Sequence, residues 1–372
     1  MNILYLTNHL NIGGVSSYVF SLAAGMKKRG HNVYLASSGG ELVPRFIREG
    51  IIYLPIPIKT KQEVSPKVLM SLFKLLGFVK EKDIQLIHAN TRVTQVLAGL
   101  VNKFSGKTYL STCHGFFKNR LSRRLFPCWG RKVIAISEAV KEHLLYDFEV
   151  KEEDIKLIHN GIDTDKFRIP ACPAGRQSSG FRVNRKRELG LGNGPVVGII
   201  GRLSDVKGHI YLIEAMKSVL EKIPDAQLLI VGEGKMKKEL SGLVRRLRIE
   251  RSVYFLPSVA DTGRVLAAMD LFVMPSLKEG LGLSLMEAQA SGLAVIGSDV
   301  GGIRSLIRDG YNGLLVGPGD AAALSAAILN LLQDKDKAGL LGQNARSFIQ
   351  ENFPEERMIS ETERLYLDCH AR

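Results

Sequence analysis

The sequence predicts an α/β fold with two doubly wound domains, each a parallel sheet with helices on both faces. Short strand-like runs alternate with helical patterns along most of the chain, as in parallel strands joined by crossover helices. The alternation breaks once near the middle and then restarts. With 372 residues and 45% hydrophobic composition, the chain is long enough to bury two cores of ordinary domain size.

The first half is expected to form one domain over residues 1–170. Its strand-like runs are short, apolar and separated by segments of helical pattern. They lie at residues 3–7, 33–37, 51–55, 84–89, 108–113, 133–137 and 155–159.

A stretch rich in Pro, Gly, Ser and Arg follows, and we place a basic linker over residues 171–190. A second domain is expected over residues 191–352. Its strands are expected near residues 196–201, 227–231, 253–256, 271–275, 294–298 and 313–316. The pattern is helical after residue 320, and Pro354 starts a last helix within residues 353–372. Two such domains are expected to face a cleft, where ligand pockets tend to form.

The composition argues against membrane-spanning and disulfide-stabilised proteins. No apolar run approaches the ~20 residues of a membrane-spanning helix, and the first residues lack a basic leader. We therefore expect a soluble, unprocessed, cytoplasmic protein. The four cysteines show no metal-binding or disulfide spacing and are expected to be free thiols: Cys113, Cys128, Cys172 and Cys369.

The positive charge is concentrated in the first half of the chain. Residues 1–170 hold 25 Lys and Arg against 14 Asp and Glu, within a formal net charge of +14. Such asymmetry indicates an anionic partner, either a phosphorylated acceptor, an acidic lipid surface or nucleic acid, although plain solubility explains it equally well. The chain carries none of the usual nucleic-acid-reading motifs, so nucleic acid is not expected.

Two acids, Glu279 and Glu287, flank a glycine-rich turn that leads from a strand into a helix. In open α/β sheets such loops line the ligand crevice, so we expect both acids to face one ligand. The amides of Gly280, Leu281 and Gly282 at the helix start suit an anionic group. Carboxylates repel phosphate but bind hydroxyl groups well, so the ligand predicted here combines a polyol with an anion, as a sugar nucleotide does.

Two cations follow the first strand of the second domain. Arg202 offers a planar fork and Lys207 a point charge, and together they suit a diphosphate. The alternative is a surface ion pair with Asp205.

Two motifs in the first domain also follow strands. Gly13 and Gly14 precede the first helix and allow a ligand to approach the backbone, although two glycines are also ordinary turn chemistry. His114 could bind a hydroxyl group or stabilise charge, although a single histidine is more often structural.

Two further segments left alternatives open. Asp163 and Asp165 have the spacing of a divalent-metal motif, but Arg202 and Lys207 already supply the positive charge, so no metal is expected. Residues 116–132 mix aromatic residues with six cations and no acid. This composition suits an interfacial anchor on anionic lipid, and equally an amphipathic helix with its apolar face in the core.

As a set, these motifs resemble the retaining GT-B glycosyltransferases of family 4 (glycosyl transferases group 1). The resemblance rests on Glu279 with Glu287 and on the Gly201-Arg202, Lys207-Gly208 and Gly301-Gly302 pairs, together with Gly13-Gly14, His114, the segments 160–163, 231–234 and 309–316, all in family order. It implies two Rossmann-like domains, with the donor held mainly by the second, the acceptor by the first, and the last helix crossing back to the first. The basic segment 176–187 makes the linker longer than the resemblance requires.

The resemblance also implies roles for single residues. Arg202 and Lys207 would bind the diphosphate and stabilise it as it leaves, Glu287 would hold the ribose, and Glu279 would bind sugar hydroxyls with the amides of Gly280, Leu281 and Gly282. His114 would touch the sugar, and Gly13 and Gly14 would approach the phosphates.

The predicted activity is a metal-independent, retaining transfer from a UDP-sugar or GDP-sugar, with no resident cofactor, to a glycan or lipid-linked acceptor. Envelope polysaccharide or lipopolysaccharide synthesis is the expected setting, with a peripheral position on the inner face of the cytoplasmic membrane. A nucleotide-sugar epimerase of similar fold and a non-catalytic sugar-nucleotide binding protein remain the alternatives. Donor base, sugar, acceptor and linkage have no residue code in the sequence.

Overall fold

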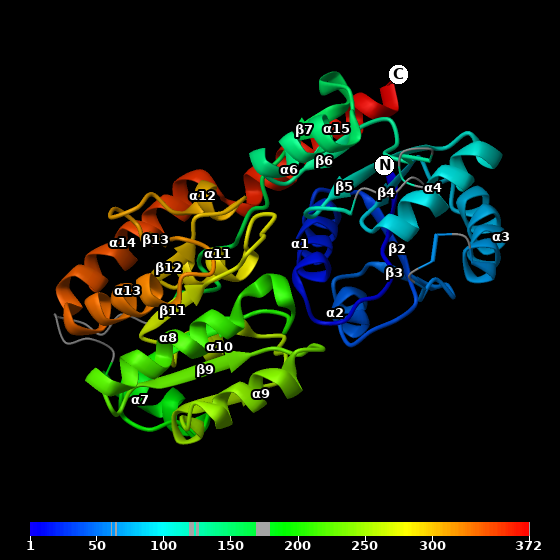
Figure 1. The fold of residues 1–372 in the computed structure, drawn as a ribbon. Helices are drawn as coiled ribbons and strands as arrows, with labels where there is room; N and C mark the ends of the chain where they lie inside the picture. Colours follow the sequence, from blue (N-terminus) through cyan, green and yellow to red (C-terminus); the bar gives the residue numbers. More distant parts are fainter. Residues whose placement is uncertain (61, 64, 119–122, 124–125, 169–178, 372) are drawn as a thin grey trace. The chain divides into compact units, whose positions relative to one another are not determined.

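The computed structural model describes all residues except 61, 64, 119–122, 124–125, 169–178 and 372 (Figure 1). The chain divides into two compact units, which are described separately below. The first unit contains residues Met1–Gly161 and Glu355–Arg372, and the second contains Ile162–Pro354. Both are α/β units with wholly parallel sheets, so the predicted fold class is confirmed.

The first unit has a seven-stranded sheet in the order β3-β2-β1-β4-β5-β6-β7. Its strands are β1 (Asn2–Leu6), β2 (Asn32–Ser37), β3 (Ile52–Pro55), β4 (Leu86–Ala89), β5 (Thr108–Cys113), β6 (Val133–Ala135) and β7 (Ile155–Leu157). Its α-helices are α1 (Gly14–Lys28), α2 (Val43–Arg48), α3 (Pro66–Glu81), α4 (Arg92–Ser105), α6 (Glu138–Glu142) and α15 (Glu355–Ala371). A π-helical turn, η1 (His143–Asp147), follows α6, and a 3-10 turn, η2 (Glu152–Asp154), precedes β7.

The two faces of this sheet follow from the alternation of side chains along each strand. In β1, Ile3 and Tyr5 pack into a core with α1 and α15, whereas Leu4 and Leu6 pack into a core with α3 and α4. A strand buried on both faces reads as a continuous apolar run, which is why the sequence pattern located these strands to within one or two residues.

The second unit has a six-stranded sheet in the order β10-β9-β8-β11-β12-β13. Its strands are β8 (Val196–Ile200), β9 (Gln227–Val231), β10 (Val253–Leu256), β11 (Leu271–Met274), β12 (Ala294–Ser298) and β13 (Leu314–Val316). Its α-helices are α7 (Ser179–Glu188), α8 (His209–Lys222), α9 (Lys237–Arg246), α10 (Thr262–Leu266), α11 (Leu283–Ala290), α12 (Ile303–Leu306), α13 (Ala321–Gln333) and α14 (Lys335–Asn352). Two 3-10 turns, η3 (Asp205–Lys207) and η4 (Glu250–Ser252), complete it.

Helices cover both faces of this sheet as well. Leu271 and Val273 of β11 join a core with α8, α9 and α13. The intervening Phe272 is fully buried and, by strand alternation, faces the other side, where α11 and α14 pack against β12. The order of strands reverses between β8 and β11, and such a reversal places a ligand crevice at the carboxyl ends of those two strands.

The expected linker is corrected by the structure. The chain passes from the first unit to the second after Gly161, not within residues 171–190. Of that range, residues 171–178 lie outside the described part, and Ser179–Glu188 forms helix α7. This helix belongs to the second unit because Lys186 and Arg182 pair with Asp270, at 2.7 and 2.8 Å. Although burial opposes it, these two cations hold the pKa of Asp270 below its ordinary value.

Candidate functional site

The ends of β8 and β11 bring two of the sequence motifs together. The two strands are neighbours in the sheet, so the loop carrying Lys207 meets the loop carrying Glu279. Lys207 forms an ion pair with Glu279, and the hydroxyl of Ser276 donates a hydrogen bond to the same carboxylate at 3.3 Å. The alternative partner, Asp205, pairs with Lys235 instead, at 2.7 Å.

Two glycines hold these loops close to each other. Gly208 has a φ of +68°, and a Cβ there would lie 1.8 Å from the carbonyl oxygen of Pro275. A Cβ on Gly302 would lie 2.1 Å from the carbonyl oxygen of Gly280, and the amide of Gly302 donates to the carbonyl of Glu279 at 3.0 Å. Any side chain at either position would push the loops apart, so glycine is required by packing here.

Several donors beside this ion pair have no partner within the described residues. Arg202 is exposed and makes no hydrogen bond or ion pair there. Likewise, the backbone amides of Leu281, Gly282 and Leu283 donate no hydrogen bond to any described residue. Because α11 starts at Leu283, these amides lie at the positive end of its dipole. A guanidinium group and unpaired amides at the same carboxyl edge of a sheet can bind an anion.

Glu287 lies in the second turn of α11 and has partners of its own. The side chain of Thr262 and the charge of Lys166 each act to lower the pKa of its carboxyl group. Burial outweighs both effects and raises the pKa of Glu287 to about 7. Glu279 and Glu287 follow the same strand, but the partners given for the two acids within the described residues differ. Sequence reasoning missed Thr262 and Lys166, since both come from segments distant from Glu287 in the sequence and nothing there indicates that they act on it.

In the first unit, His114 lies close to the first helix. Its ring meets Tyr18 of α1 edge to face, with centroids 4.7 Å apart, and its Nε2 lies 3.3 Å from the amide oxygen of Asn90. Burial lowers the pKa of His114 to about 3, so the ring is neutral at pH 7. A Cβ at Gly13 or Gly14 would meet no atom within 4 Å, so the backbone at the start of α1 is open to a ligand.

A chain of buried hydrogen bonds lies beneath His114 and was not predicted. His88 Nδ1 lies 2.6 Å from the Tyr366 hydroxyl, and its Nε2 lies 2.7 Å from the Thr112 hydroxyl. Tyr366 donates to Tyr5 at 3.0 Å, and Tyr18 lies 3.2 Å from Thr112. Since the Tyr366 proton goes to Tyr5, His88 Nδ1–H donates to Tyr366 and Nε2 accepts from Thr112. This tautomer is neutral, and burial lowers the pKa of His88 to about 3.

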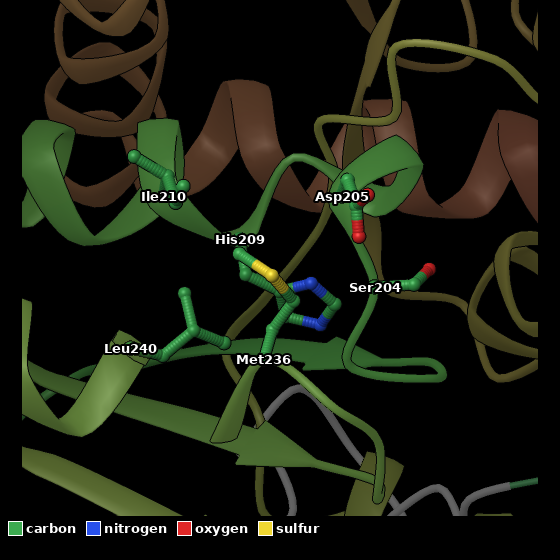
Figure 2. A pocket seen from close by; sticks show the side chains of 6 residues that line it. All are labelled: Ser204, Asp205, His209, Ile210, Met236 and Leu240. Atoms are coloured by element: carbon green, nitrogen blue, oxygen red, sulfur yellow. The ribbon is translucent and has the colours of Figure 1, made fainter. Parts of the chain in front are cut away.

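A small cavity lies beside the Lys207 loop (Figure 2). Its empty volume of about 160 Å³ includes space open to solvent, so the enclosed part is too small for a small-molecule ligand. His209 lines it, is 2% exposed and has no hydrogen-bond partner on either ring nitrogen, and the Ser204 hydroxyl is also unpaired within the described residues. Burial lowers the pKa of His209 to about 4. The cavity lining is Ser204, Asp205, His209, Ile210, Met236 and Leu240.

The remaining two sequence alternatives are answered in part. Asp163 accepts hydrogen bonds from the backbone amides of Asp165 and Lys166, at 3.1 and 3.4 Å, as in an ordinary turn.

In the segment 116–132, residues 119–122 and 124–125 lie outside the described part. Phe117 stacks on Trp129, which is 7% exposed, and the guanidinium of Arg123 lies 4.1 Å from the Phe117 ring centre. Trp129 thus packs into the core, whereas Phe126 of the same segment is 67% exposed, so both alternatives for this segment stay open.

No described helix is both long enough and apolar enough to cross a bilayer. No described group of three or more His, Cys, Asp or Glu side chains is arranged to hold a metal ion.

Known proteins similar to this chain cover nearly all of it. The family description "Glycosyltransferase Family 4" matches residues 12–166, and "Glycosyl transferases group 1" matches residues 181–348. The chain is 29% identical over 318 residues to UDP-Gal:alpha-D-GlcNAc-diphosphoundecaprenol alpha-1,3-galactosyltransferase of Escherichia coli, covering 81% of this chain and 79% of that protein. It is 25% identical over 375 residues to N-acetyl-alpha-D-glucosaminyl L-malate synthase of Bacillus anthracis, covering 98% and 96%.

Among solved structures, Anabaena Alr3699/HepE in complex with UDP and glucose shares the fold. Its TM-score is 0.86 at 24% identity, covering 98% of this chain and 99% of that chain. Motifs, strand topology and relatives agree, and the chain belongs to the GT-B glycosyltransferases of family 4, the glycosyl transferases group 1.

Proposed function

We propose that this glycosyltransferase moves a sugar, with retention of configuration, from a UDP-sugar or GDP-sugar to a hydroxyl group of a glycan or lipid-linked acceptor in envelope polysaccharide synthesis. The observation that carries the proposal is the meeting of Lys207, Glu279 and the Arg202 loop at the switch between β8 and β11. Cations beside a carboxylate suit a ligand that is anionic at one end and rich in hydroxyl groups at the other. Relatives that use UDP-galactose or bind UDP and glucose support the donor class.

The chemistry follows the movement of charge. As the bond between the anomeric carbon and the diphosphate oxygen breaks, negative charge grows on the leaving group, where Arg202 and Lys207 stabilise it. The acceptor oxygen forms the new bond on the same face, and its proton passes to the departing phosphate oxygen. These two cations supply the positive charge that a divalent ion provides elsewhere, so we propose a metal-independent reaction.

The other residues would hold the donor in place. We assign Glu287 to the ribose hydroxyls, and Glu279, with the amides of Gly280, Leu281 and Gly282, to the sugar hydroxyls. In the first unit we assign His114 to the sugar and Gly13 and Gly14 to close approach of the phosphates. The neutral state of His114 suits a hydrogen bond to a hydroxyl group and does not suit an ion pair with phosphate. We assign the acceptor to the first unit. The names of the relatives include both a lipid-linked acceptor and the small molecule L-malate.

The test begins with a panel of UDP-sugars and GDP-sugars in a thermal-shift assay, because a tight donor stabilises the folded state by mass action. Hydrolysis and transfer are then measured with the best donor, and the anomeric configuration of the product is read by NMR. Arg202→Ala and Lys207→Ala should each lower kcat by about 100-fold. The matched controls are Arg251→Ala and Lys217→Ala, exposed cations of the same unit.

Each other outcome excludes part of the proposal. Conversion of the donor to an epimer without acceptor would identify an epimerase, and binding without any hydrolysis or transfer would identify a binding protein. An inverted product would refute retention. Loss of activity on chelation, restored by a divalent ion, would refute metal independence.

A further inference from the structure

We propose that the exposed face of helix α3 in the first unit docks onto an anionic lipid bilayer. Three large apolar side chains project from this face: Leu69 is 52% exposed, Met70 60% and Phe73 67%. They are named the α3 patch below. Adjacent exposed side chains of this size are costly in water unless they meet a partner, and their spacing places them on one helical face.

The patch is additional to the face that packs into the core. Val68, Leu72, Leu75 and Val79 are buried against α4, so the helix already has its ordinary apolar side. One turn further on, Leu76 is half-buried and packs against that core, and Gly77 is exposed, with no atom within 4 Å of where a Cβ would lie. A helix that is apolar on its solvent side as well as its core side is suited to lie at a membrane interface.

Lysines border the patch without carboxylate partners. Lys67, Lys74 and Lys80 are exposed and form no ion pair within the described residues. The ammonium groups of Lys67 and Lys74 instead donate to backbone carbonyls, at 3.3 and 2.7 Å. The acid on this helix, Glu81, pairs with Lys82 at 2.8 Å.

This arrangement selects anionic lipid over a second copy of the chain. Two copies meeting through the same face would bring unpaired lysines against lysines, and like charges oppose such contact. Anionic headgroups would neutralise the lysines while the acyl region receives Leu69, Met70 and Phe73. The composition of residues 116–132 also suggested a lipid anchor, and Phe126 there is 67% exposed, but Phe117 and Trp129 of that segment pack together, whereas all three side chains of the α3 patch are exposed.

The proposed function explains why docking of α3 would be useful, since a lipid-linked acceptor would be presented at a bilayer surface. The binding itself does not depend on turnover. The two claims can therefore be tested apart.

The experiment is flotation of the full chain with vesicles of phosphatidylcholine alone or with added phosphatidylglycerol. We expect binding to the anionic vesicles only, weakened by salt. Leu69→Ser combined with Phe73→Ser should reduce the partition coefficient by about 100-fold, because each buried apolar side chain contributes roughly tenfold. Lys67, Lys74 and Lys80 changed together to Gln should reduce it by about 100-fold as well, at roughly fivefold each.

Matched controls use exposed residues of the second unit. Leu340→Ser alters a leucine that is 58% exposed on α14, and a triple change of Lys222, Lys237 and Lys238 to Gln removes the same charge elsewhere. Neither control should change vesicle binding. Circular dichroism and thermal unfolding confirm that the α3 variants fold, as expected for exposed positions.

Four results would overturn the docking proposal. One is vesicle binding that the α3 variants leave unchanged, and another is an equal loss in the second-unit controls. The third is a concentration-dependent dimer, seen by analytical ultracentrifugation, that Phe73→Ser dissociates, because the patch would then be covered by a second copy. Wild-type protein that transfers sugar but binds no vesicle refutes docking and leaves the enzyme assignment intact. Vesicle binding without turnover of any donor would support docking and refute the proposed transfer activity.

Discussion

At the scale of single residues, burial decides the charge state of the groups that matter most. Glu287 and His209 both belong to the second unit, where His209 is buried and Glu287 is half-buried. Burial disfavours the charged form of each group, so it raises the pKa of the acid and lowers that of the base. The two residues therefore make the stability of this unit depend on pH in opposite directions.

Glu287 should make the second unit less stable as pH rises. Its pKa is about 7 in the fold against 4.5 when exposed, so the stability present below pH 4.5 is lost as pH rises through 7. Glu287→Gln should remove this loss and stabilise the unit at pH 8 by on the order of 3 kcal/mol. Hydrogen exchange of α11 in urea at pH 5 and pH 8 measures the difference in stability between the variant and the wild type, with the exposed Glu214→Gln as control. The same variant should bind the donor more weakly at pH 8, and equal stability of variant and wild type at both pH values would refute the assignment.

His209 should make the same unit less stable as pH falls. Its folded pKa of about 4 lies below the ordinary 6.5, so the stability present above pH 6.5 is lost as pH falls through 4. Since neither ring nitrogen has a partner within the described residues, His209→Leu should be within about 1 kcal/mol of wild type at pH 7. At pH 5 the variant should be more stable by about 2 kcal/mol. Urea unfolding at both pH values tests this, with the exposed His370→Leu as control, and a variant more sensitive to acid than wild type would contradict it.

At the scale of helices and strands, sequence patterns located the parts that depend on local periodicity. Apolar runs placed the strands and put Lys207 and Glu279 on loops that follow strands, whereas the meeting of these two loops depends on the strand order that the structure gives. The patterns failed where a structure depends on distant partners. The Arg-rich composition of α7 predicted a linker, because nothing near Lys186 reveals that Asp270 balances its charge.

The His88 chain of hydrogen bonds was invisible in the sequence for the same reason. A histidine and three tyrosines within apolar segments read as ordinary core residues, and their contacts join β1, α1, β4, β5 and α15. The roles of single residues toward a ligand, such as His114 and Glu279, stay predictions, since side-chain contacts within the protein do not test them.

His88→Leu should destabilise the first unit strongly. The change keeps the volume similar but leaves the buried hydroxyls of Thr112 and Tyr366 without their shared partner. The expected cost is about 2–4 kcal/mol, and Tyr366→Phe in the same background should add less than it costs alone, because both act on one chain of bonds. Chemical unfolding of the single and double variants measures this. The exposed Tyr146→Phe serves as control, and a cost below about 0.5 kcal/mol for His88→Leu would show that the bonds are unimportant.

At the scale of the whole molecule, the chain crosses between the two units twice. The first unit is completed only by α15, the last helix, which is red in Figure 1. Arg29 at the end of α1 pairs with Glu356 and Glu363 of α15, and His31 lies 2.7 Å from Glu363. Met358, Ile359 and Tyr366 of α15 enter the same core as Ile3 and Tyr5 of β1. The first strand and the last helix therefore stabilise one core, so that core depends on both ends of the chain.

The contact between Gly25 of α1 and Ile359 of α15 tests this dependence. A Cβ on Gly25 would lie 2.4 Å from Ile359 Cδ1, so Gly25→Ala should destabilise the first unit by about 1–3 kcal/mol through overpacking. Ile359→Ala should cost about 2–4 kcal/mol through the cavity it leaves. In the double variant the new methyl group occupies part of that cavity, so the combined cost should fall below the sum by at least about 1 kcal/mol. Hydrogen exchange measured separately for β1 and β8 checks that the loss of stability is confined to the first unit. The amides of β1 should lose protection, whereas those of β8, in the other unit, should keep their protection. Strict additivity would show that α1 and α15 are not packed together at this point in solution.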